Sequence, residues 1–112
     1  MLLENKTAVI TGCMQGIGQA VMDLFAREGA DIFACCQCET EEFKEHIAAL
    51  SAETGREIIP VYFDLRDDDA IREGAHTIQK AKKKIDMLIN VAGIADDAMI
   101  IKIEKEDTSR YD

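Results

Sequence analysis

Short apolar runs alternate along this chain with longer segments in which apolar positions recur at helical spacing. The apolar runs cover residues 7–11, 31–36, 58–63 and 87–91, and each is predicted to be a buried strand. Pro60 lies inside the third run and lacks a backbone N–H, so we expect this strand at an edge of the sheet.

Three segments with helical periodicity separate these runs. The first should bury one face and end near Gly29, the second begins at a Thr40 cap and ends at Gly55, and the third covers residues 67–84. The residues expected to face inward on the first and third helices are Ile17, Ala20, Val21, Leu24 and Phe25, and Ile71, Ala75, Ile78 and Ile85. A further helix is expected to begin within residues 104–112.

Strict alternation with short links predicts an α/β fold with a parallel sheet and right-handed crossovers. We expect a doubly wound, Rossmann-type sheet of strand order 3-2-1-4 with helices on both faces, in a single domain covering residues 1–112. A fifth strand is missing from this pattern, so the sheet is expected to be incomplete on the side of the fourth strand, where the apolar edge is an aggregation hazard.

Composition limits the partners of the chain. The net charge of −9 disfavours nucleic acid, and no apolar stretch approaches the length of a membrane span. Without a recognisable signal peptide the protein is expected to be cytoplasmic, with four free thiols. A metal site at Cys35, Cys36 and Cys38 is disfavoured because neighbouring strand residues point to opposite faces. His46 and His76 are expected on exposed helix faces.

The candidate chemistry begins where the first strand ends. Gly12 permits a tight turn, Gly16 lets the backbone approach a diphosphate, and Gly18 lets the following helix pack against the sheet. Amide groups at the start of such a helix bind phosphate well. Glycine-rich turns before helices also occur for structural reasons alone, and the motif by itself leaves that alternative open.

Two further motifs follow the third and fourth strands. Asp64 is placed to accept a hydrogen bond from an adenine amine, or is a turn or capping aspartate. Asn90 lies at the end of the fourth strand, and is either part of the same site or a buried polar group that bridges strands. Gly93 fits the site or a simple turn. The carboxyl ends of parallel strands are where open α/β sheets bind ligands.

Together, Thr11-Gly-x-x-x-Gly16-Ile-Gly18, Asp64-Leu65 and Asn90-x-Ala92-Gly93 resemble the pattern of the short-chain dehydrogenase/reductase family over nearly the whole chain. Residues 85–94 and 97–103 look most like its 3-oxoacyl-acyl-carrier-protein reductase branch. The resemblance implies hydride transfer between a nicotinamide cofactor and a small carbonyl, alcohol or acyl thioester substrate, by a protein that forms homo-oligomers. The cofactor-binding residues it implies are Gly12, Met14, Gln15, Gly16, Ile17, Gly18, Cys36, Gln37, Asp64, Leu65, Asn90, Ala92 and Gly93.

The resemblance leaves the choice between NADP and NAD open and favours NADP. NAD-preferring relatives carry an acid at the end of the second strand, where this chain has Cys36 and Gln37. The arginine that NADP-preferring relatives usually supply is absent from the glycine turn, and Lys44 and Arg66 are other candidate phosphate partners. Alkylation of Cys13 and Cys36 is expected to weaken nucleotide binding if both thiols lie near the ribose, although both residues also suit small core positions.

The resemblance assigns no catalytic residue to this chain. Family members use a serine, a tyrosine with a lysine four residues later, and an asparagine, all expected beyond Asp112. Tyr62, Tyr111 and Ser109 do not fit these roles. We therefore expect the chain to be the dinucleotide-binding half of an oxidoreductase. The alternatives are a stand-alone nucleotide-binding module, an interaction module completed by a partner, and, less well supported, a methyltransferase.

Overall fold

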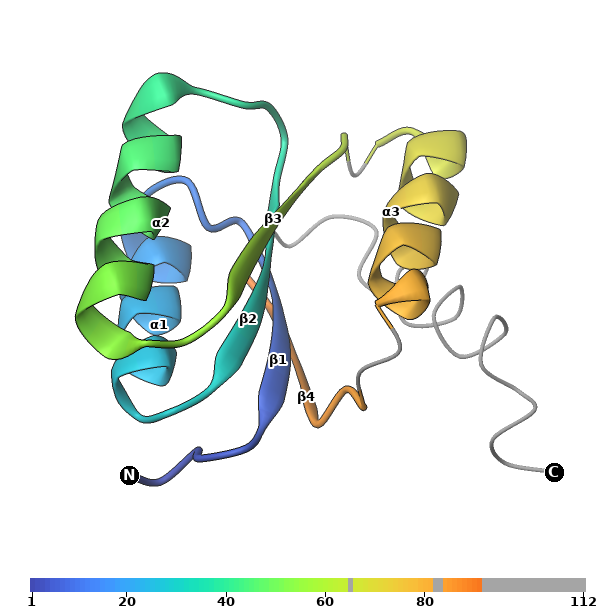
Figure 1. Cartoon of the computed structure of the whole chain (residues 1–112). Helices are drawn as coiled ribbons and strands as arrows, with labels where there is room; N and C mark the ends of the chain where they lie inside the picture. Colours follow the sequence, from blue (N-terminus) through green and yellow to red (C-terminus); the bar gives the residue numbers. More distant parts are fainter. Residues whose placement is uncertain (65, 82–83, 92–112) are drawn as a thin grey trace, which may run out of the picture.

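The computed structural model describes residues 1–64, 66–81 and 84–91 of the chain (Figure 1). Strands and helices alternate as the pattern predicts. In order they are β1 (Thr7–Thr11), α1 (Gly16–Arg27), β2 (Asp31–Cys36), α2 (Glu41–Thr54), β3 (Ile58–Tyr62), α3 (Asp68–Lys80) and β4 (Met87–Asn90). The helix expected within residues 104–112 lies outside the described residues. None of the described helices is long and apolar enough to cross a membrane.

The four strands form one parallel sheet in the order β3-β2-β1-β4, as predicted. Pro60 pairs with Ala34 on β2 and lies in an edge strand, where its missing N–H removes no bond to a further strand. β4 pairs with β1 and forms the opposite edge of the described sheet.

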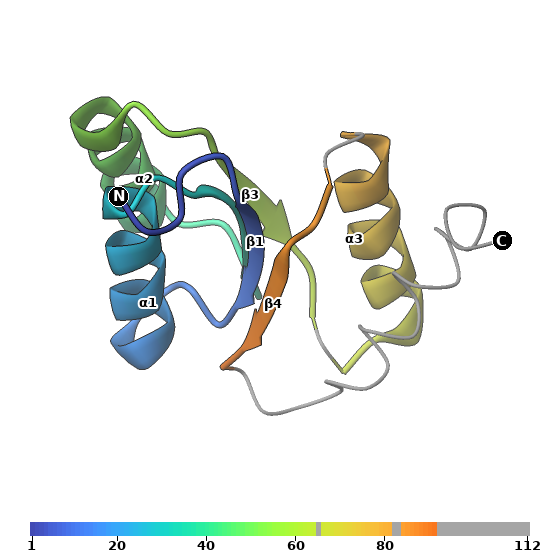
Figure 2. The ribbon, with the colours of Figure 1, turned by 90° about the horizontal axis from the view of Figure 1, so that it is seen from below.

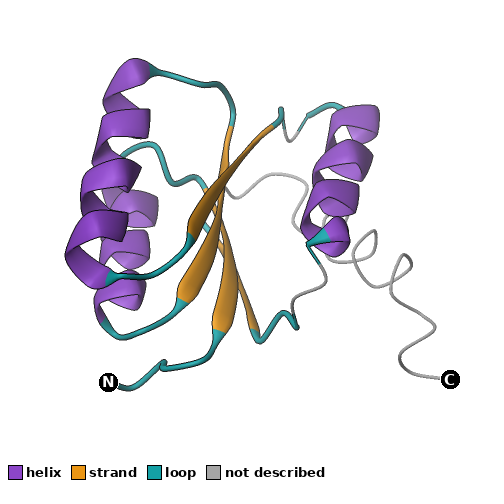
Figure 3. Cartoon of the chain, in the orientation of Figure 1, coloured by secondary structure: helices purple, strands orange, loops and turns teal. Residues whose placement is uncertain are grey.

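Helices cover both faces of the sheet. α1 and α2 lie side by side on one face and α3 lies on the other, which Figures 2 and 3 show from two directions. Side chains alternate along β2, so Ile32, Ala34 and Cys36 join the core beneath α1 and α2, whereas Phe33 and Cys35 join the core beneath α3. The sheet thus separates two apolar layers, and its carboxyl edge remains open between them.

Side-chain caps begin two of the helices. Thr40 Oγ1 accepts a hydrogen bond from the Phe43 amide at 3.1 Å at the start of α2, as the sequence predicts. Asp67 caps α3 through the amides of Asp69 and Ala70. Each bond satisfies an amide that the first turn of a helix leaves without an internal partner.

The buried face of α1 differs from the prediction. Ile17 and Leu24 are 73% and 57% exposed and Ala20 is also exposed, whereas Gly18, Met22 and Ala26 are buried. The cause is the position of Gly18, where a Cβ atom would overlap the carbonyl oxygen of Gly12. This approach fixes the rotation of the helix, because residues four apart lie on one face, so the row through 18, 22 and 26 must face the sheet. Val21 and Phe25 pack at the border of the core.

The third helix is shorter than predicted. It ends at Lys80, and Ile85 lies in the link before β4, where it packs against the core beneath α3. Ile85 follows Ile78 by two helical turns, so its periodicity matches a helix although its burial comes from the link.

Side chains bind β1 to β4 at both ends. Thr11 is fully buried; its hydroxyl donates to Asn90 Oδ1 at 2.8 Å and accepts from the Val91 amide at 3.1 Å. At the other end, Asp86 Oδ2 accepts from the Thr7 amide at 2.9 Å, and the Asp86 amide donates to the Thr7 carbonyl. These contacts join segments almost eighty residues apart and fix the register of the two strands.

Replacing Thr11 by valine should lower the free energy of unfolding by about 1–3 kcal/mol, because a part-buried carboxamide oxygen and a part-buried amide lose their partner. Urea denaturation of the chain measures this change. Thr11→Ser is the matched control, since it keeps the hydroxyl and removes a methyl group. A valine variant at least as stable as the serine variant would contradict the importance of these bonds.

The contact between Gly18 and Gly12 should make alanine far more costly at Gly18 than at Gly16. Gly18→Ala forces a Cβ into a backbone carbonyl and should destabilise the chain by about 3 kcal/mol or more. Gly16 has a φ of 62° and open space around it, so Gly16→Ala meets only conformational strain of about 1–2 kcal/mol. Parallel urea titrations compare the two, and equal losses would contradict the assigned contact.

Candidate functional site

The turn between β1 and α1 places several backbone amides at the carboxyl edge of the sheet. Gly12 has a φ of 71°, which lets the chain leave β1 sharply, and the Cys13 amide donates to the Cys35 carbonyl at 3.3 Å. Gln19 Nε2 donates to the Met14 carbonyl at 3.0 Å and closes the turn from the helix side. The predicted glycine roles in turn geometry and close packing therefore agree with the structure.

The N-terminus of α1 differs from those of the other two described helices. Its N-cap residue, Gln15, makes no side-chain capping bond, and its first turn contains no acid. By contrast, α2 and α3 are both capped and both carry two acids in the first turn, namely Glu41, Glu42, Asp68 and Asp69. The first amides of α1 are thus available to an external acceptor, and the positive end of its dipole is not neutralised locally.

A cavity of about 770 Å³ opens beside this turn, within the range of ligand-binding pockets. Its walls come from the glycine turn and from residues at or just beyond the ends of the four strands. They are Gly12, Met14, Gln15, Gly16, Cys35, Cys36, Gln37, Cys38, Phe63, Asp64, Arg66 and Val91. The structure therefore brings together the predicted residues of the glycine turn, the end of β2 and the end of β3 in one cavity.

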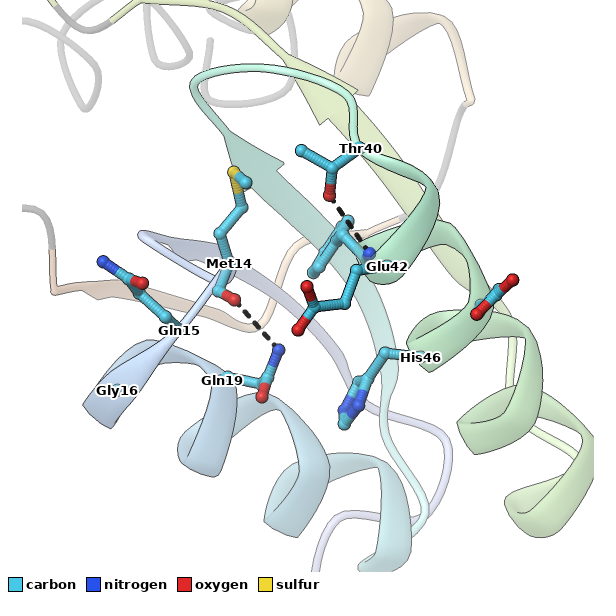
Figure 4. A pocket seen from close by; sticks show the side chains of 9 residues that line it. Met14, Gln15, Gly16, Gln19, Thr40, Glu42 and His46 are labelled. Atoms are coloured by element: carbon cyan, nitrogen blue, oxygen red, sulfur yellow. Dashed lines mark hydrogen bonds between the residues drawn. The ribbon is translucent and has the colours of Figure 1, made fainter.

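A second cavity, of about 540 Å³, lies between α1 and α2 and shares Met14, Gln15 and Gly16 with the first (Figure 4). Glu42 and Glu45 are among its lining residues. His46 also lines it and lies 2.8 Å from Asp23 on α1, so this histidine is less exposed than predicted. Two carboxylates disfavour a phosphate here, and the larger cavity is the better candidate for an anionic ligand.

Asp64 and Arg66 are the charged residues among those that line the larger cavity. The Arg66 side chain contacts both carboxylate oxygens of Asp64 at 3.2 Å, and its amide donates to Oδ1 at 2.9 Å. These hydrogen bonds hold the pKa of Asp64 below its ordinary value, so the group is a carboxylate near neutral pH. A carboxylate with further lone pairs is an acceptor for an amine.

The end of β2 presents thiol and amide groups to the larger cavity. Cys36 is buried, whereas Gln37 and Cys38 are exposed. Lys44 does not line this cavity and is paired with Glu39 at 3.2 Å and with Glu41 at 3.5 Å. Both candidate phosphate partners, Lys44 and Arg66, therefore already have acidic neighbours.

The remaining predicted residues lie differently. The Asn90 side chain bridges β4 to β1 through its Oδ1 and Thr11, as the strand-bridging alternative expects, whereas its buried Nδ2 has no hydrogen-bond partner among the described residues. The exposed side chain of Ile17 does not line the larger cavity, and Gly18 is buried behind it. Leu65, Ala92 and Gly93 lie outside the described residues.

The wall residues that sequence reasoning did not assign to this site are Cys35, Cys38, Phe63 and Val91, and Arg66 was considered only as a phosphate partner. Phe63 and Val91 are apolar, and each directly follows the end of its strand. Proximity to the carboxyl ends of β3 and β4 is the signal that could have identified them.

Within the described part of the chain, no cluster of three or more histidine, cysteine or acidic side chains could hold a metal ion. Cys35 and Cys36 belong to the cores on opposite faces of the sheet. This separation follows from strand alternation, as expected.

Comparison with known proteins places this geometry in context. A 3-oxoacyl-[acyl-carrier-protein] reductase FabG of Thermotoga maritima is 34% identical over 110 residues, which cover 96% of this chain and 43% of the relative. A 2,3-dihydro-2,3-dihydroxybenzoate dehydrogenase of Bacillus subtilis is 37% identical over 94% of this chain and 40% of its own length. The chain thus spans less than half the length of these curated relatives.

Solved structures show the same fold. Carveol dehydrogenase from Mycobacterium avium, in complex with NAD, matches with a TM-score of 0.72 and 26% identity over 83% of this chain and 37% of that protein. L-sorbose reductase from Gluconobacter frateurii, complexed with NADPH and L-sorbose, matches with a TM-score of 0.74 and 21% identity over 92% and 46% of the two chains. The family model described as short chain dehydrogenase matches residues 6–111, and the chain belongs to this family.

Proposed function

We propose that this chain is the dinucleotide-binding part of an NADP(H)-dependent short-chain oxidoreductase that transfers hydride to a carbonyl, with a 3-oxoacyl thioester as the substrate class. The observation that carries the proposal is the N-terminus of α1. It is uncapped, free of acids in its first turn and open to a cavity of about 770 Å³ at the carboxyl edge of the sheet. From the family resemblance we also propose that the intact protein forms a homo-oligomer.

The electrostatics of this N-terminus fit a diphosphate. The chain carries a net charge of −9, so an anionic ligand needs a local positive potential to bind. The amides and dipole of α1 supply that potential through fixed groups. A Cβ at Gly16 would meet no atom within 4 Å, so the surface beside the backbone is free for phosphate oxygens.

The rest of the cavity fits an adenosine. Asp64 offers a carboxylate to the adenine amine, and Phe63 and Val91 provide apolar wall. Cys36 and Gln37 lie where the ribose would reach the end of β2. The nicotinamide, when bound, would supply or accept the hydride, while these residues hold and orient the other end of the cofactor.

The preference for NADP rests on what lies at the end of β2. Cys36 and Gln37 provide no carboxylate that would repel a 2′-phosphate, whereas an acidic residue here would favour the free ribose hydroxyls of NAD. The shared fold holds either dinucleotide, since carveol dehydrogenase was solved with NAD and L-sorbose reductase with NADPH.

The proposed substrate class is taken from the names of two relatives, both 3-oxoacyl-[acyl-carrier-protein] reductases. We assign the proton-transfer residues to the part of those longer proteins that this chain does not match. Tyr62 is unsuited to the role, because burial and the neighbouring Glu39 raise its pKa, whereas a catalytic tyrosine in this family needs a lowered one.

An acid at the N-cap of α1 should have opposite effects on helix stability and on nucleotide binding. Gln15→Asp supplies the missing cap and should stabilise the unliganded chain by about 0.5–2 kcal/mol. The same carboxylate repels the diphosphate and should weaken NADPH binding at least about tenfold, equivalent to ~1.4 kcal/mol. Urea denaturation with and without NADPH measures both, since NADPH at 100 times its dissociation constant should stabilise the original chain by about 2.7 kcal/mol.

Gln15→Asn is the matched control for this experiment, because it adds a neutral cap. It should stabilise the helix with a smaller loss of NADPH affinity. If NADPH does not stabilise the unmodified chain, that result would contradict the proposed dinucleotide site. Equal affinity in the aspartate variant would contradict the role assigned to α1.

The 112-residue chain alone should bind the cofactor without turning it over. Purified chain, NADPH and an acetoacetyl thioester should show no consumption of NADPH above the rate without protein, measured by absorbance. The physical reason is that the positioned acid and base of the family are not found among these residues. NADPH consumption proportional to chain concentration would contradict this assignment.

A further inference from the structure

Four sulfur atoms gather around the glycine turn. Cys13 follows Gly12 and is fully buried, and Cys36 at the end of β2 is 4% exposed. The exposed Cys38 has its Sγ 3.9 Å from the Sδ of Met14, which lies in the same turn. The sulfur-bearing groups thus lie where the proposed cofactor would place its diphosphate and ribose.

Cys13 and Cys36 form a contacting pair within this group. The bond from the Cys13 amide to the Cys35 carbonyl holds the turn against the end of β2, and both side chains belong to the core beneath α1 and α2. The Cys13 thiol donates to the Ile10 carbonyl at 3.2 Å, and each of the two thiols shifts the pKa of the other. Cys35 points to the core on the opposite face of the sheet, so β2 offers Cys36 as the partner of Cys13.

The two thiols differ in pKa. Interaction with the Cys13 thiol lowers the pKa of Cys36, against the opposing effect of burial. Interaction with Cys36 raises the pKa of Cys13, and burial raises it further. Cys36 is also among the residues that line the larger cavity and Cys13 is not, so a small oxidant in that cavity has a path to Cys36 rather than to Cys13. Cys13 lies behind it as a protonated second thiol.

We propose that Cys13 and Cys36 form a reversible disulfide under hydrogen peroxide and that this bond closes the glycine turn to the dinucleotide. The Cys36 thiolate attacks peroxide, forming an S–O bond, breaking the O–O bond and releasing hydroxide. The Cys13 sulfur then attacks the sulfenic acid, and the S–S bond forms as water leaves. Peroxide is reduced and the two thiols are oxidised. A dithiol such as dithiothreitol reduces the disulfide back to the two thiols.

Closure follows from geometry and rests on the proposed dinucleotide function. A disulfide holds its sulfurs about 2.05 Å apart, much closer than two thiols that are not covalently linked. Cys13 is therefore drawn toward β2, and the amides between Cys13 and Gly16 move with it. Bound dinucleotide would cover Cys36 from the cavity side and slow the oxidation.

The test is peroxide treatment of the reduced chain, followed by intact mass and peptide mapping without reduction. The expected product has lost two hydrogen atoms and contains a Cys13–Cys36 peptide pair. NADPH binding should weaken at least about tenfold and return after dithiothreitol. NADPH present during the treatment should slow formation of the pair.

Alanine variants locate the pair. Cys13→Ala and Cys36→Ala should each prevent the loss of two hydrogens, and alanine suits these small apolar positions. Cys35→Ala and Cys38→Ser are the matched controls and should still form the Cys13–Cys36 pair. If either alanine variant fails to fold, mapping of the unmodified sequence still identifies the linked peptides.

The outcomes distinguish this inference from the proposed function. A link through Cys38, a link between two chains, or oxygen addition without a disulfide would overturn it, even if reduced chain binds NADPH. A Cys13–Cys36 disulfide that leaves NADPH affinity unchanged would overturn the closure. Reduced chain that forms the disulfide but never binds NADPH would instead contradict the dinucleotide site.

Discussion

The close approach of Gly18 to the Gly12 carbonyl sets the geometry on which the site depends. It fixes both the distance of α1 from β1 and the rotation of α1 about its axis. With that rotation, Met22 and Ala26 are buried, and Gln15 and Gly16 at the start of α1 line the larger cavity. A side chain at position 18 would move the helix outward, and the same movement would carry its N-terminus away from the cavity. Core packing and the position of the α1 N-terminus are therefore two results of one backbone contact.

The charge distribution determines which helix N-terminus and which cavity are favourable for an anion. Acids occupy the first turns of α2 and α3, where they are close to the positive ends of those helices. α1 has none, so its dipole remains available in a chain of net charge −9. Glu42 and Glu45 line the neighbouring cavity, and their charges disfavour phosphate there. Of these two cavities, the larger one at the ends of the strands is therefore the more favourable for an anionic ligand.

Periodicity predicted the elements and the strand order because short links and apolar runs leave few parallel topologies. It was wrong about Leu24 and Ile85, since period alone does not reveal a close backbone contact or burial in a link. The position of Asp64 directly after a strand predicted that it would line the cavity. Its pairing with Arg66 depends on side-chain conformation, which the sequence pattern does not reveal. The Thr11–Asn90 bond joins residues distant in sequence, and only the fold brings them together.

The end of β2 connects cofactor preference to thiol chemistry. Strand alternation directs Cys36 to the face that Cys13 occupies and Cys35 to the other face. An acid at this end of the strand, as in NAD-preferring relatives, would repel a 2′-phosphate and would also disfavour a thiolate beside it. A chain with Cys36 and Gln37 here lacks that carboxylate on the side chains that end β2. On the proposed function, tolerance of a 2′-phosphate and thiolate formation at Cys36 would both follow from the same local absence of a carboxylate.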